Sequence, residues 1–261
     1  MKVIVLGKGY LGSEFERNGY DVRGRGFFNA QSLHNMPLSK LDDFNIIINC
    51  IGNSDTRWCE DPRNFEEAMF VNAYVPKILS DYCKLNNKRF VHISTGCLYD
   101  KNNSRENNNL VSHCNYTVTK FAAERLIDPS RDLIIRPRLL FSDVVNKKNL
   151  LVKLPNFKHY IYDKWDSLTC TTTIVEAVQS LLDNDQVGVF NVANDGNASI
   201  FDIASWCGWA EYTKIIGIED LRAEQGLYLV NNTMRLEKLK QFYQPPKLKD
   251  IVIDCFSKLY V

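Results

Sequence analysis

Residues 2–12 read KVIVLGKGYLG, and this stretch decides the expected fold. The apolar run at residues 2–6 has the composition of a strand buried on both faces. It leads into the pattern G-x-G-x-x-G at Gly7, Gly9 and Gly12, where a helical segment begins. In such a unit the first glycine makes the tight turn, the second lets a pyrophosphate approach the backbone, and the third lets the helix pack on the strand. The stretch therefore predicts a dinucleotide-binding loop that includes Tyr10 and Leu11, with the anion at the helix N-terminus.

Apolar runs and segments of helical periodicity alternate through the next part of the chain. We expect strands at 21–23, 46–49, 90–94 and 133–135, and helices at 11–17, 62–85 and 116–127. This alternation predicts an α/β fold, a Rossmann-like doubly wound parallel sheet covered by helices on both faces.

The same reading gives an expected division of the chain. Residues 1–140 form the dinucleotide-binding domain, and residues 141–261 form a smaller C-terminal substrate-binding region. That region would contain helices at 173–182, 200–206 and 248–259, while a strand near 187–192 would return to the main sheet. The polar tract at 100–109, directly after a strand and a short connection, is expected to be a loop that can cover a site.

Composition excludes several other classes of protein. The chain has 261 residues, and its 32 Lys and Arg nearly balance its 31 Asp and Glu, so no excess of positive charge favours a nucleic-acid partner. No apolar run approaches the roughly 18 residues of a membrane span, and the N-terminus leads directly into the glycine motif rather than a signal peptide. The eight cysteines form no C-x-x-C pair and the four histidines form no cluster, which argues against a metal site or a disulfide framework. We expect a cytoplasmic protein with reduced thiols.

The segment after the second expected strand concerns the choice of cofactor. NAD-preferring sites usually place Asp or Glu there to bind the ribose hydroxyls. This sequence has VRGRG at residues 22–26 instead, and a guanidinium suits a 2′-phosphate. We therefore expect NADP(H), held by Arg25 ahead of Arg23; the alternative is a pair of solvated surface arginines.

A tyrosine and a lysine four residues apart suggest acid–base chemistry. Tyr116 and Lys120 share one face of the expected helix, and a nearby ammonium would lower the pKa of the phenol. About 20 residues upstream, the strand at 90–94 ends in hydroxyl residues, Ser94 and Thr95. Because parallel sheets bind ligands at the carboxyl ends of their strands, these groups are expected to meet in one site.

Taken together, these motifs resemble the extended short-chain dehydrogenase/reductase superfamily over nearly the whole chain. Besides the glycine loop and the hydroxyl–tyrosine–lysine set, the similarity includes NCIG at 49–52, Asn72, RP at 136–137 and GVFNVAND at 188–195. The resemblance implies that Thr95 donates a hydrogen bond to the substrate oxygen, that Tyr116 is the acid/base and that Lys120 activates it. It also implies that Asn49, Tyr116 and Lys120 contact the cofactor along with the glycine loop.

Within that superfamily the chain is similar to nucleotide-sugar 4-keto reductases, namely dTDP-4-dehydrorhamnose reductases and bifunctional 3,5-epimerase/4-reductases of UDP-sugars. The similarity lies in WCE at 58–60, STGCLYD at 94–100, RPRLLFS at 136–142 and NLLVK at 149–153. It implies an epimerase acid/base pair of Cys97 and Lys153, and substrate contacts from Arg138 and Asn149. Cys97 lies two residues after Thr95, so on an extended strand both side chains would face one pocket. The alternatives are a packed thiol at Cys97 and a surface lysine at Lys153.

The function expected from the sequence is NADPH-dependent reduction of a nucleotide-linked 4-keto-6-deoxysugar, with 3,5-epimerisation in the same site. UDP, dTDP and GDP sugars all stay open as substrates. One alternative is a 4-epimerase or dehydratase of the same fold that retains its cofactor, and another is a non-catalytic NADP-binding protein. A homodimer is one expectation for its assembly.

Overall fold

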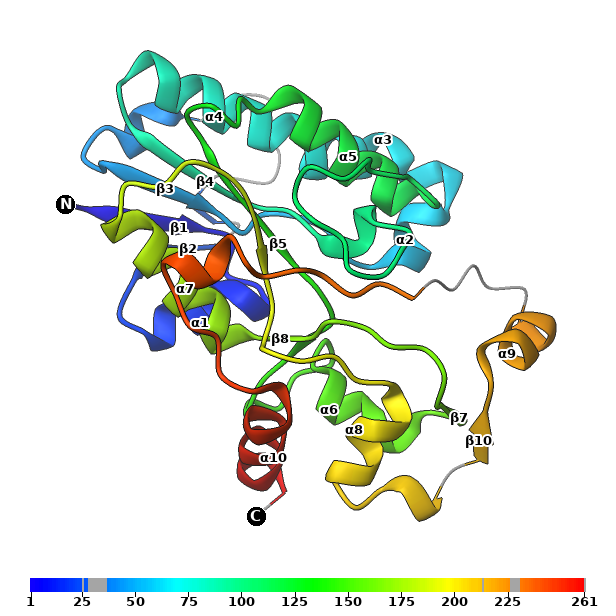
Figure 1. The fold of residues 1–261 in the computed structure, drawn as a ribbon. Helices are drawn as coiled ribbons and strands as arrows, with labels where there is room; N and C mark the ends of the chain where they lie inside the picture. The colour runs from blue at the N-terminus through cyan, green and yellow to red at the C-terminus, as the bar shows by residue number, and fades with distance from the viewer. Residues whose placement is uncertain (25, 28–36, 213, 226–230, 261) are drawn as a thin grey trace. The chain divides into compact units, whose positions relative to one another are not determined.

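The computed structural model describes residues 1–24, 26–27, 37–212, 214–225 and 231–260 (Figure 1). The chain divides into two compact units, and each has its own buried apolar core. Unit one comprises residues 1–98, 110–136 and 185–190; unit two comprises residues 99–109, 137–184 and 191–261.

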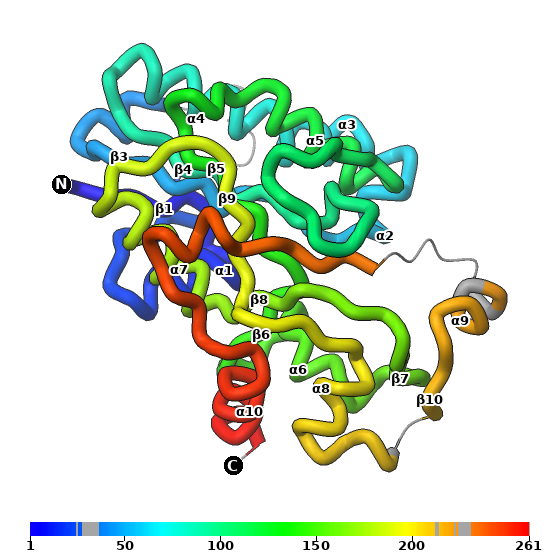
Figure 2. The backbone as a smooth tube through the Cα atoms, in the orientation of Figure 1, coloured from blue at the N-terminus to red at the C-terminus, as the bar shows by residue number. Residues whose placement is uncertain are grey.

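A six-stranded sheet forms the centre of unit one. Its order is β2 (Asp21–Arg23), β1 (Val3–Leu6), β3 (Ile46–Asn49), β4 (Arg89–Ile93), β5 (Leu133–Pro137) and β9 (Gly188–Val192). The pairs from β2 through β5 are all parallel. From β1 the chain moves to one side to form β2 and then crosses to the other side to form β3, which is the doubly wound topology expected from the sequence. The expected return of the strand near 187–192 is also seen, since β9 lies next to β5 (Figure 2).

Helices of unit one follow the expected order, with one notable difference in the segment 62–85. This segment is a 3₁₀ turn η3 (Pro62–Asn64), a helix α3 (Phe65–Met69), a π-helical turn η4 (Phe70–Tyr74) and a helix α4 (Val75–Leu85). Pro76 in the first turn of α4 lacks an N–H, so continuous α-helical bonding through this point is impossible. The other elements of the unit are α1 (Tyr10–Arg17), η2 (Leu38–Leu41), α2 (Thr56–Glu60), η5 (Gly96–Leu98) and α5 (Asn115–Leu126).

The glycine loop has the local geometry that its three glycines predict. Gly7 has φ of +106°, and its N–H donates to the Arg23 carbonyl at 2.8 Å. A Cβ atom on Gly12 would lie 1.9 Å from the Gly7 carbonyl oxygen, so helix α1 can pack on β1 only with glycine there. A Cβ on Gly9 would meet no atom within 4 Å. Gly9 therefore borders open space at the start of α1.

Unit two contains the shorter elements. Two small parallel pairs, β6 (Leu140–Phe141) with β8 (Thr169–Cys170) and β7 (His159–Ile161) with β10 (Lys214–Ile216), accompany the helices. The helices and turns are α6 (Leu150–Lys153), η6 (Leu154–Asn156), α7 (Thr171–Asp183), α8 (Ile200–Trp206), η7 (Ala210–Tyr212), α9 (Ile218–Gln225), η8 (Leu239–Gln241) and α10 (Leu248–Leu259). The expected helices α7, α8 and α10 are present, and α7 begins two residues earlier than predicted. None of the helices in the described part of the chain has the length and apolar content that a bilayer crossing requires.

The polar tract at 100–109 is a loop, as predicted, and it is anchored within unit two. The Ser104 N–H donates to the Thr233 carbonyl at 2.9 Å, and the Arg235 N–H donates to the Ser104 carbonyl at 2.9 Å. The Asn191 side chain also donates to the Ser104 carbonyl at 3.0 Å. These bonds tie the tract to the segment at 232–235, which argues against a freely moving cover.

The glycine loop allows a matched pair of substitutions. Gly12→Ala forces a methyl group against the Gly7 carbonyl, so we expect a stability loss of roughly 1–3 kcal/mol or more. Gly9→Ala places its methyl group in open space and is expected to change stability by less than about 1 kcal/mol. Urea unfolding followed by circular dichroism measures both midpoints. Equal midpoints for the two variants would contradict the packing argument.

Candidate active site

The carboxyl ends of β3 and β4 bring the expected polar groups of unit one together. Asn49 is the last residue of β3, and its partner in register on β4 is His92. Thr95 follows β4 and is buried, and α5 carries Tyr116 and Lys120. This is the edge at which doubly wound sheets bind ligands.

Tyr116 is held in a protonated state by its surroundings. Burial raises the pKa of the phenol above its ordinary value, and Cys97 adds to the rise. A hydrogen bond with the Thr95 side chain opposes this rise. The expectation that Lys120 lowers this pKa stays a prediction, because the group that opposes the rise in the described residues is the Thr95 hydroxyl. A protonated phenol suits Tyr116 to donate a proton.

Lys120 faces the end of the sheet through two contacts. Its Nζ donates to the Ile93 carbonyl at 2.9 Å and lies 3.2 Å from His92 Nε2. The other ring nitrogen, His92 Nδ1, lies 3.2 Å from Asn49 Nδ2. Burial lowers the pKa of Lys120 to about 8, against the opposing effects of Glu124 and Cys50. Nothing in the sequence motifs singled out His92, which sits inside an apolar strand.

Helix α5 is fixed to the sheet by a buried ion pair. Arg136 Nε on β5 donates to Glu124 Oε1 and Oε2 at 3.0 and 3.1 Å, and both side chains are buried. Ser94 also donates to Glu124. On the other side, Asn72 Nδ2 donates to Thr119 Oγ1 at 3.0 Å, which ties the π turn to α5. These contacts hold Tyr116 and Lys120 in place over the strand ends.

Cys97 is near Tyr116, but by a different geometry from the one expected. Strand β4 ends at Ile93, and residues 96–98 form a 3₁₀ turn, so the argument from alternating side chains on a strand is wrong. The turn is closed by Thr95, whose Oγ1 accepts the Cys97 N–H at 3.1 Å. Cys97 is half-buried, and it contributes to the raised pKa of Tyr116.

The glycine loop offers a place for a pyrophosphate. Gly9 caps α1 without a side chain, no acidic residue lies in the first turn, and the space at its α-carbon is open. The geometry fits the expected roles of the three glycines, while cofactor contacts from Tyr10 and Leu11, the first two residues of α1, stay a prediction. Asn49 Oδ1 is already engaged, since it accepts the Ile51 N–H at 3.1 Å.

Arg23 and Arg25 are the two arginines expected to bind a 2′-phosphate. Arg23 Nε pairs with Asp21 Oδ1 at 2.7 Å, and its guanidinium lies over the Phe27 ring at 5.7 Å from the centroid. Arg25 lies outside the described residues. Arg23 therefore has an interaction within the protein that explains its presence.

The remaining expected residues belong to unit two. Arg138 is buried and donates to Asp166 Oδ1 from both Nε (3.0 Å) and Nη2 (2.6 Å), and Lys164 pairs with the same carboxylate. Lys153 is exposed at the end of α6. Unit one thus brings together Thr95, Cys97, Tyr116 and Lys120, whereas Arg138, Asn149 and Lys153 lie in unit two.

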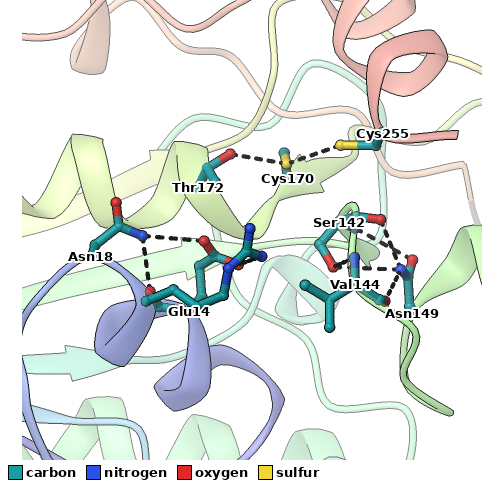
Figure 3. Close-up of polar contacts among 9 residues, drawn as sticks. Glu14, Asn18, Ser142, Val144, Asn149, Cys170, Thr172 and Cys255 are labelled. Carbon is teal, nitrogen blue, oxygen red and sulfur yellow. Dashed lines mark hydrogen bonds and ion pairs between the residues drawn. The ribbon is translucent and has the colours of Figure 1, made fainter. Parts of the chain in front are cut away.

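Asn149 has a structural explanation that the sequence did not suggest. Its side chain is fully buried and caps α6, with Oδ1 accepting the Leu151 N–H at 3.0 Å. Its Nδ2 donates to the carbonyls of Ser142 and Val144, each at 2.8 Å (Figure 3). These bonds account for its amide within the loop at 142–149.

Cysteine and histidine side chains do not assemble into a metal centre in the described ranges. No group of three or more His, Cys, Asp or Glu side chains is arranged there to hold an ion. Cys59 and Cys114, which lie near Tyr116, are free thiols.

Known proteins resemble the chain in sequence and in fold. A curated dTDP-4-keto-6-deoxy-D-glucose reductase from Streptomyces niveus is 27% identical over 168 residues, which cover 60% of this chain and 58% of that protein. A UDP-rhamnose synthase structure from Acanthamoeba polyphaga mimivirus has a TM-score of 0.84 at 21% identity, with 99% of each chain covered. A dTDP-4-dehydrorhamnose reductase from Bacillus anthracis in complex with NADP has a TM-score of 0.82 at 18% identity, covering 99% of this chain and 100% of that one. At these identities the structural matches show a shared fold.

A family match extends over most of the sequence. Residues 1–213 match the family described as the RmlD substrate binding domain. This range includes the glycine loop, the Tyr116–Lys120 pair and the three expected site residues of unit two, Arg138, Asn149 and Lys153. The chain therefore belongs to the RmlD substrate-binding-domain family.

Proposed function

We propose that this protein is an NADPH-dependent reductase of a nucleotide-linked 4-keto-6-deoxysugar. The observation that carries the proposal is the grouping of Thr95, Tyr116 and Lys120 at the carboxyl end of β4, in the same unit as a glycine loop with open space at Gly9. The family match and the reductase from Streptomyces niveus support the substrate class. The NADP bound in the Bacillus anthracis structure supports the cofactor.

The cofactor would be held by the glycine loop, with Arg25 reading the 2′-phosphate. When bound, NADPH supplies the hydride for reduction of the C4 ketone. The protein contributes the proton: Tyr116 donates its phenolic hydrogen to the C4 oxygen, and Thr95 donates a hydrogen bond to the same oxygen. Lys120 lies one helical turn from Tyr116 and supports its acid–base function.

The alternative of the same fold is a 4-epimerase or dehydratase, which begins by oxidising a sugar alcohol and retains its cofactor. A reductase instead consumes NADPH for each ketone that it reduces, so the consumption of NADPH distinguishes the two functions. A non-catalytic NADP-binding protein would have no need for the intact pair of Tyr116 and Lys120.

We propose further that the same site epimerises C3 and C5 before reduction. A ketone at C4 acidifies the hydrogens on both neighbouring carbons, and a thiolate can remove such a proton. The position of Cys97 near Tyr116 supports this role. Lys153, which is exposed at the end of α6, would act as the partner acid. The fold shared with the mimivirus UDP-rhamnose synthase is consistent with this proposal.

Cofactor choice can be tested at the two arginines after β2. Arg25→Ala should remove charge-assisted bonds worth roughly 1.5–3 kcal/mol, weakening NADPH far more than NADH. Arg23→Ala is the matched control, because Arg23 already pairs with Asp21 and should affect both cofactors alike. Titration calorimetry with each cofactor gives the dissociation constants. If NADPH and NADH weaken equally in Arg25→Ala, this residue does not read the 2′-phosphate.

The reduction step can be tested at Tyr116. Tyr116→Phe removes the phenolic proton with little change in packing, so turnover should fall by roughly 10²–10⁴-fold while NADPH binding persists. NADPH absorbance is followed with UDP- and dTDP-linked 4-keto-6-deoxyglucose. Near-normal turnover by Tyr116→Phe would remove this residue from the mechanism.

Epimerisation can be tested with deuterated water. The wild-type enzyme should place deuterium at C3 and C5 of the product, whereas Cys97→Ser should reduce the ketone without exchange, because serine does not ionise near neutral pH. Cys114→Ser is the matched control, since Cys114 also lies near Tyr116 and should keep the exchange. Product NMR locates the deuterium. A wild-type product without deuterium would make the enzyme a simple reductase.

A further inference from the structure

Tyr116 lies in the first turn of α5, where helices are least stable. It is the second residue of the helix, and the N–H groups of a first turn have no partner within the helix, so such turns fray. Cys114 occupies the cap position, where a sulfur is a weaker acceptor than the side-chain oxygen of Ser, Thr, Asp or Asn. A tyrosine that has to reach a substrate oxygen from this turn therefore needs support from outside α5.

Glu60, the last residue of α2, provides a partner for this turn. Its Oε1 accepts the N–H of Asn115, the first residue of α5, at 2.7 Å. Asn115 directly precedes Tyr116, and the two residues joined by this bond are 55 positions apart in unit one. The partial positive charge at a helix N-terminus also favours a carboxylate there. Glu60 thus caps α5 from a different helix.

Helix α2 is itself attached to its neighbours. At its start, Asp55 Oδ1 accepts the Trp58 N–H at 3.2 Å. After its end, Asn64 Nδ2 donates to the Trp58 carbonyl at 3.0 Å. The segment before α2 is joined to the π turn, because Asn72 Nδ2 donates to the Asn53 carbonyl at 3.0 Å. These bonds hold in place the helix that carries the capping carboxylate.

A second bond holds the backbone of Tyr116 on its other side. Thr119 Oγ1 donates to the Tyr116 carbonyl at 2.8 Å and accepts a hydrogen bond from Asn72 Nδ2 at 3.0 Å. The backbone of Tyr116 therefore lies between a contact at the preceding residue and a contact at its own carbonyl. The first of these comes from Glu60, whose side chain is exposed, so it can be replaced without opening a cavity in the core.

We propose that Glu60 is a positioning residue for Tyr116. Its carboxylate oxygen caps α5 and keeps the first turn helical, so that the phenol stays where it can donate to the substrate oxygen. The inference rests on the proposed reduction. The contribution of Glu60 is one of reach rather than charge, because the contact requires an acceptor oxygen at this distance from α2. Glutamine offers such an oxygen without the charge, whereas aspartate keeps the charge on a side chain that is shorter by a methylene group.

Three substitutions at Glu60 separate reach from charge. Glu60→Ala and Glu60→Asp lose the contact and should lower kcat by roughly tenfold or more, because a small displacement of a reacting group is costly. Glu60→Gln keeps the acceptor and should retain most of the wild-type kcat. NADPH absorbance with dTDP- or UDP-linked 4-keto-6-deoxyglucose measures turnover, and titration calorimetry should give an unchanged dissociation constant for NADPH. If Glu60→Asp keeps turnover and Glu60→Gln loses it, the effect is one of charge and the proposal is wrong.

Asp128→Ala is the matched control for a loss of stability alone. Asp128 Oδ1 accepts the Ser130 N–H at 2.9 Å beyond the other end of α5, and its side chain is also exposed. Loss of such a carboxylate contact should lower Tm by roughly 2–4 °C in Glu60→Ala and in Asp128→Ala alike. Turnover should fall in Glu60→Ala and persist in Asp128→Ala. An equal loss of turnover in the two variants would show that Glu60 contributes stability alone, and would refute the proposal.

Hydrogen exchange of the Asn115 N–H provides an arm that needs no substrate. NMR of ¹⁵N-labelled protein should show several-fold faster exchange at this N–H in Glu60→Ala and Glu60→Asp than in wild type and Glu60→Gln. An unchanged rate in Glu60→Ala would overturn the inference whatever the enzyme reduces. If the exchange rates are as expected but the wild-type protein reduces no 4-keto sugar, the proposed function fails while the cap by Glu60 stands. The two failures are therefore distinguishable.

Discussion

Burial of Lys120 behind the ends of β3 and β4 constrains the other polar groups of unit one. An ammonium in such a place is costly unless acceptors surround it, and here it finds one carbonyl, from Ile93. The remaining contact is with His92, whose Nε2 lies 3.2 Å from Lys120 Nζ. The low pKa of Lys120 and the high pKa of Tyr116 have the same origin, since in both cases burial disfavours the charged form.

The positions of Tyr116 and Lys120 depend on helix α5, which is attached on two sides to neighbouring elements. The pairing of Glu124 with Arg136 is a buried, bidentate contact between the helix and β5, and Asn72 joins the helix to the π turn. Breaking one partner of a buried ion pair is far more disruptive than its net contribution to stability suggests, because the other charge is left uncompensated. The π turn is part of the same arrangement. It precedes Pro76, whose missing N–H interrupts regular helical bonding, and Asn72 within it also accepts the Asn53 N–H at 2.7 Å.

Local patterns predicted the parts of the structure that local chemistry determines. The strand and glycine loop at 2–12 were predictable because the steric demand on Gly12 is local, since a Cβ there would meet the Gly7 carbonyl oxygen. The strands β2 and β3 and helices α8 and α10 were predicted with the bounds that the structure has. The two-residue strand β6 and the four-residue helix α6 were not predicted, because neither is long enough to show a period. The contacts of His92 could not be predicted either, because they depend on the strand register that places it beside Asn49. Likewise, the 3₁₀ turn at Cys97 and the hydrogen bonds of the Asn149 side-chain amide depend on contacts that cannot be predicted from the spacing of residues in the sequence.

Three cysteines, Cys59, Cys97 and Cys114, contribute to the raised pKa of Tyr116. The structure distinguishes them as candidates for the proposed epimerase acid/base. Cys59 is fully buried, and burial with nearby acidic groups raises its pKa to about 11, so it is poorly suited to proton exchange near neutral pH. Cys114 lies at the start of α5, where its sulfur contacts Thr117 Oγ1 at 3.5 Å as part of the helix cap. Cys97 differs from both because it is half-buried on a short turn whose backbone is held by the Thr95 hydroxyl. The same hydroxyl is the proposed donor to the substrate oxygen. The C4 oxygen of a bound sugar would therefore contact a residue that lies two positions before Cys97 in the sequence. An acid/base that acts on a carbon next to the ketone needs this placement, which favours Cys97 over the other two thiols as the epimerase group.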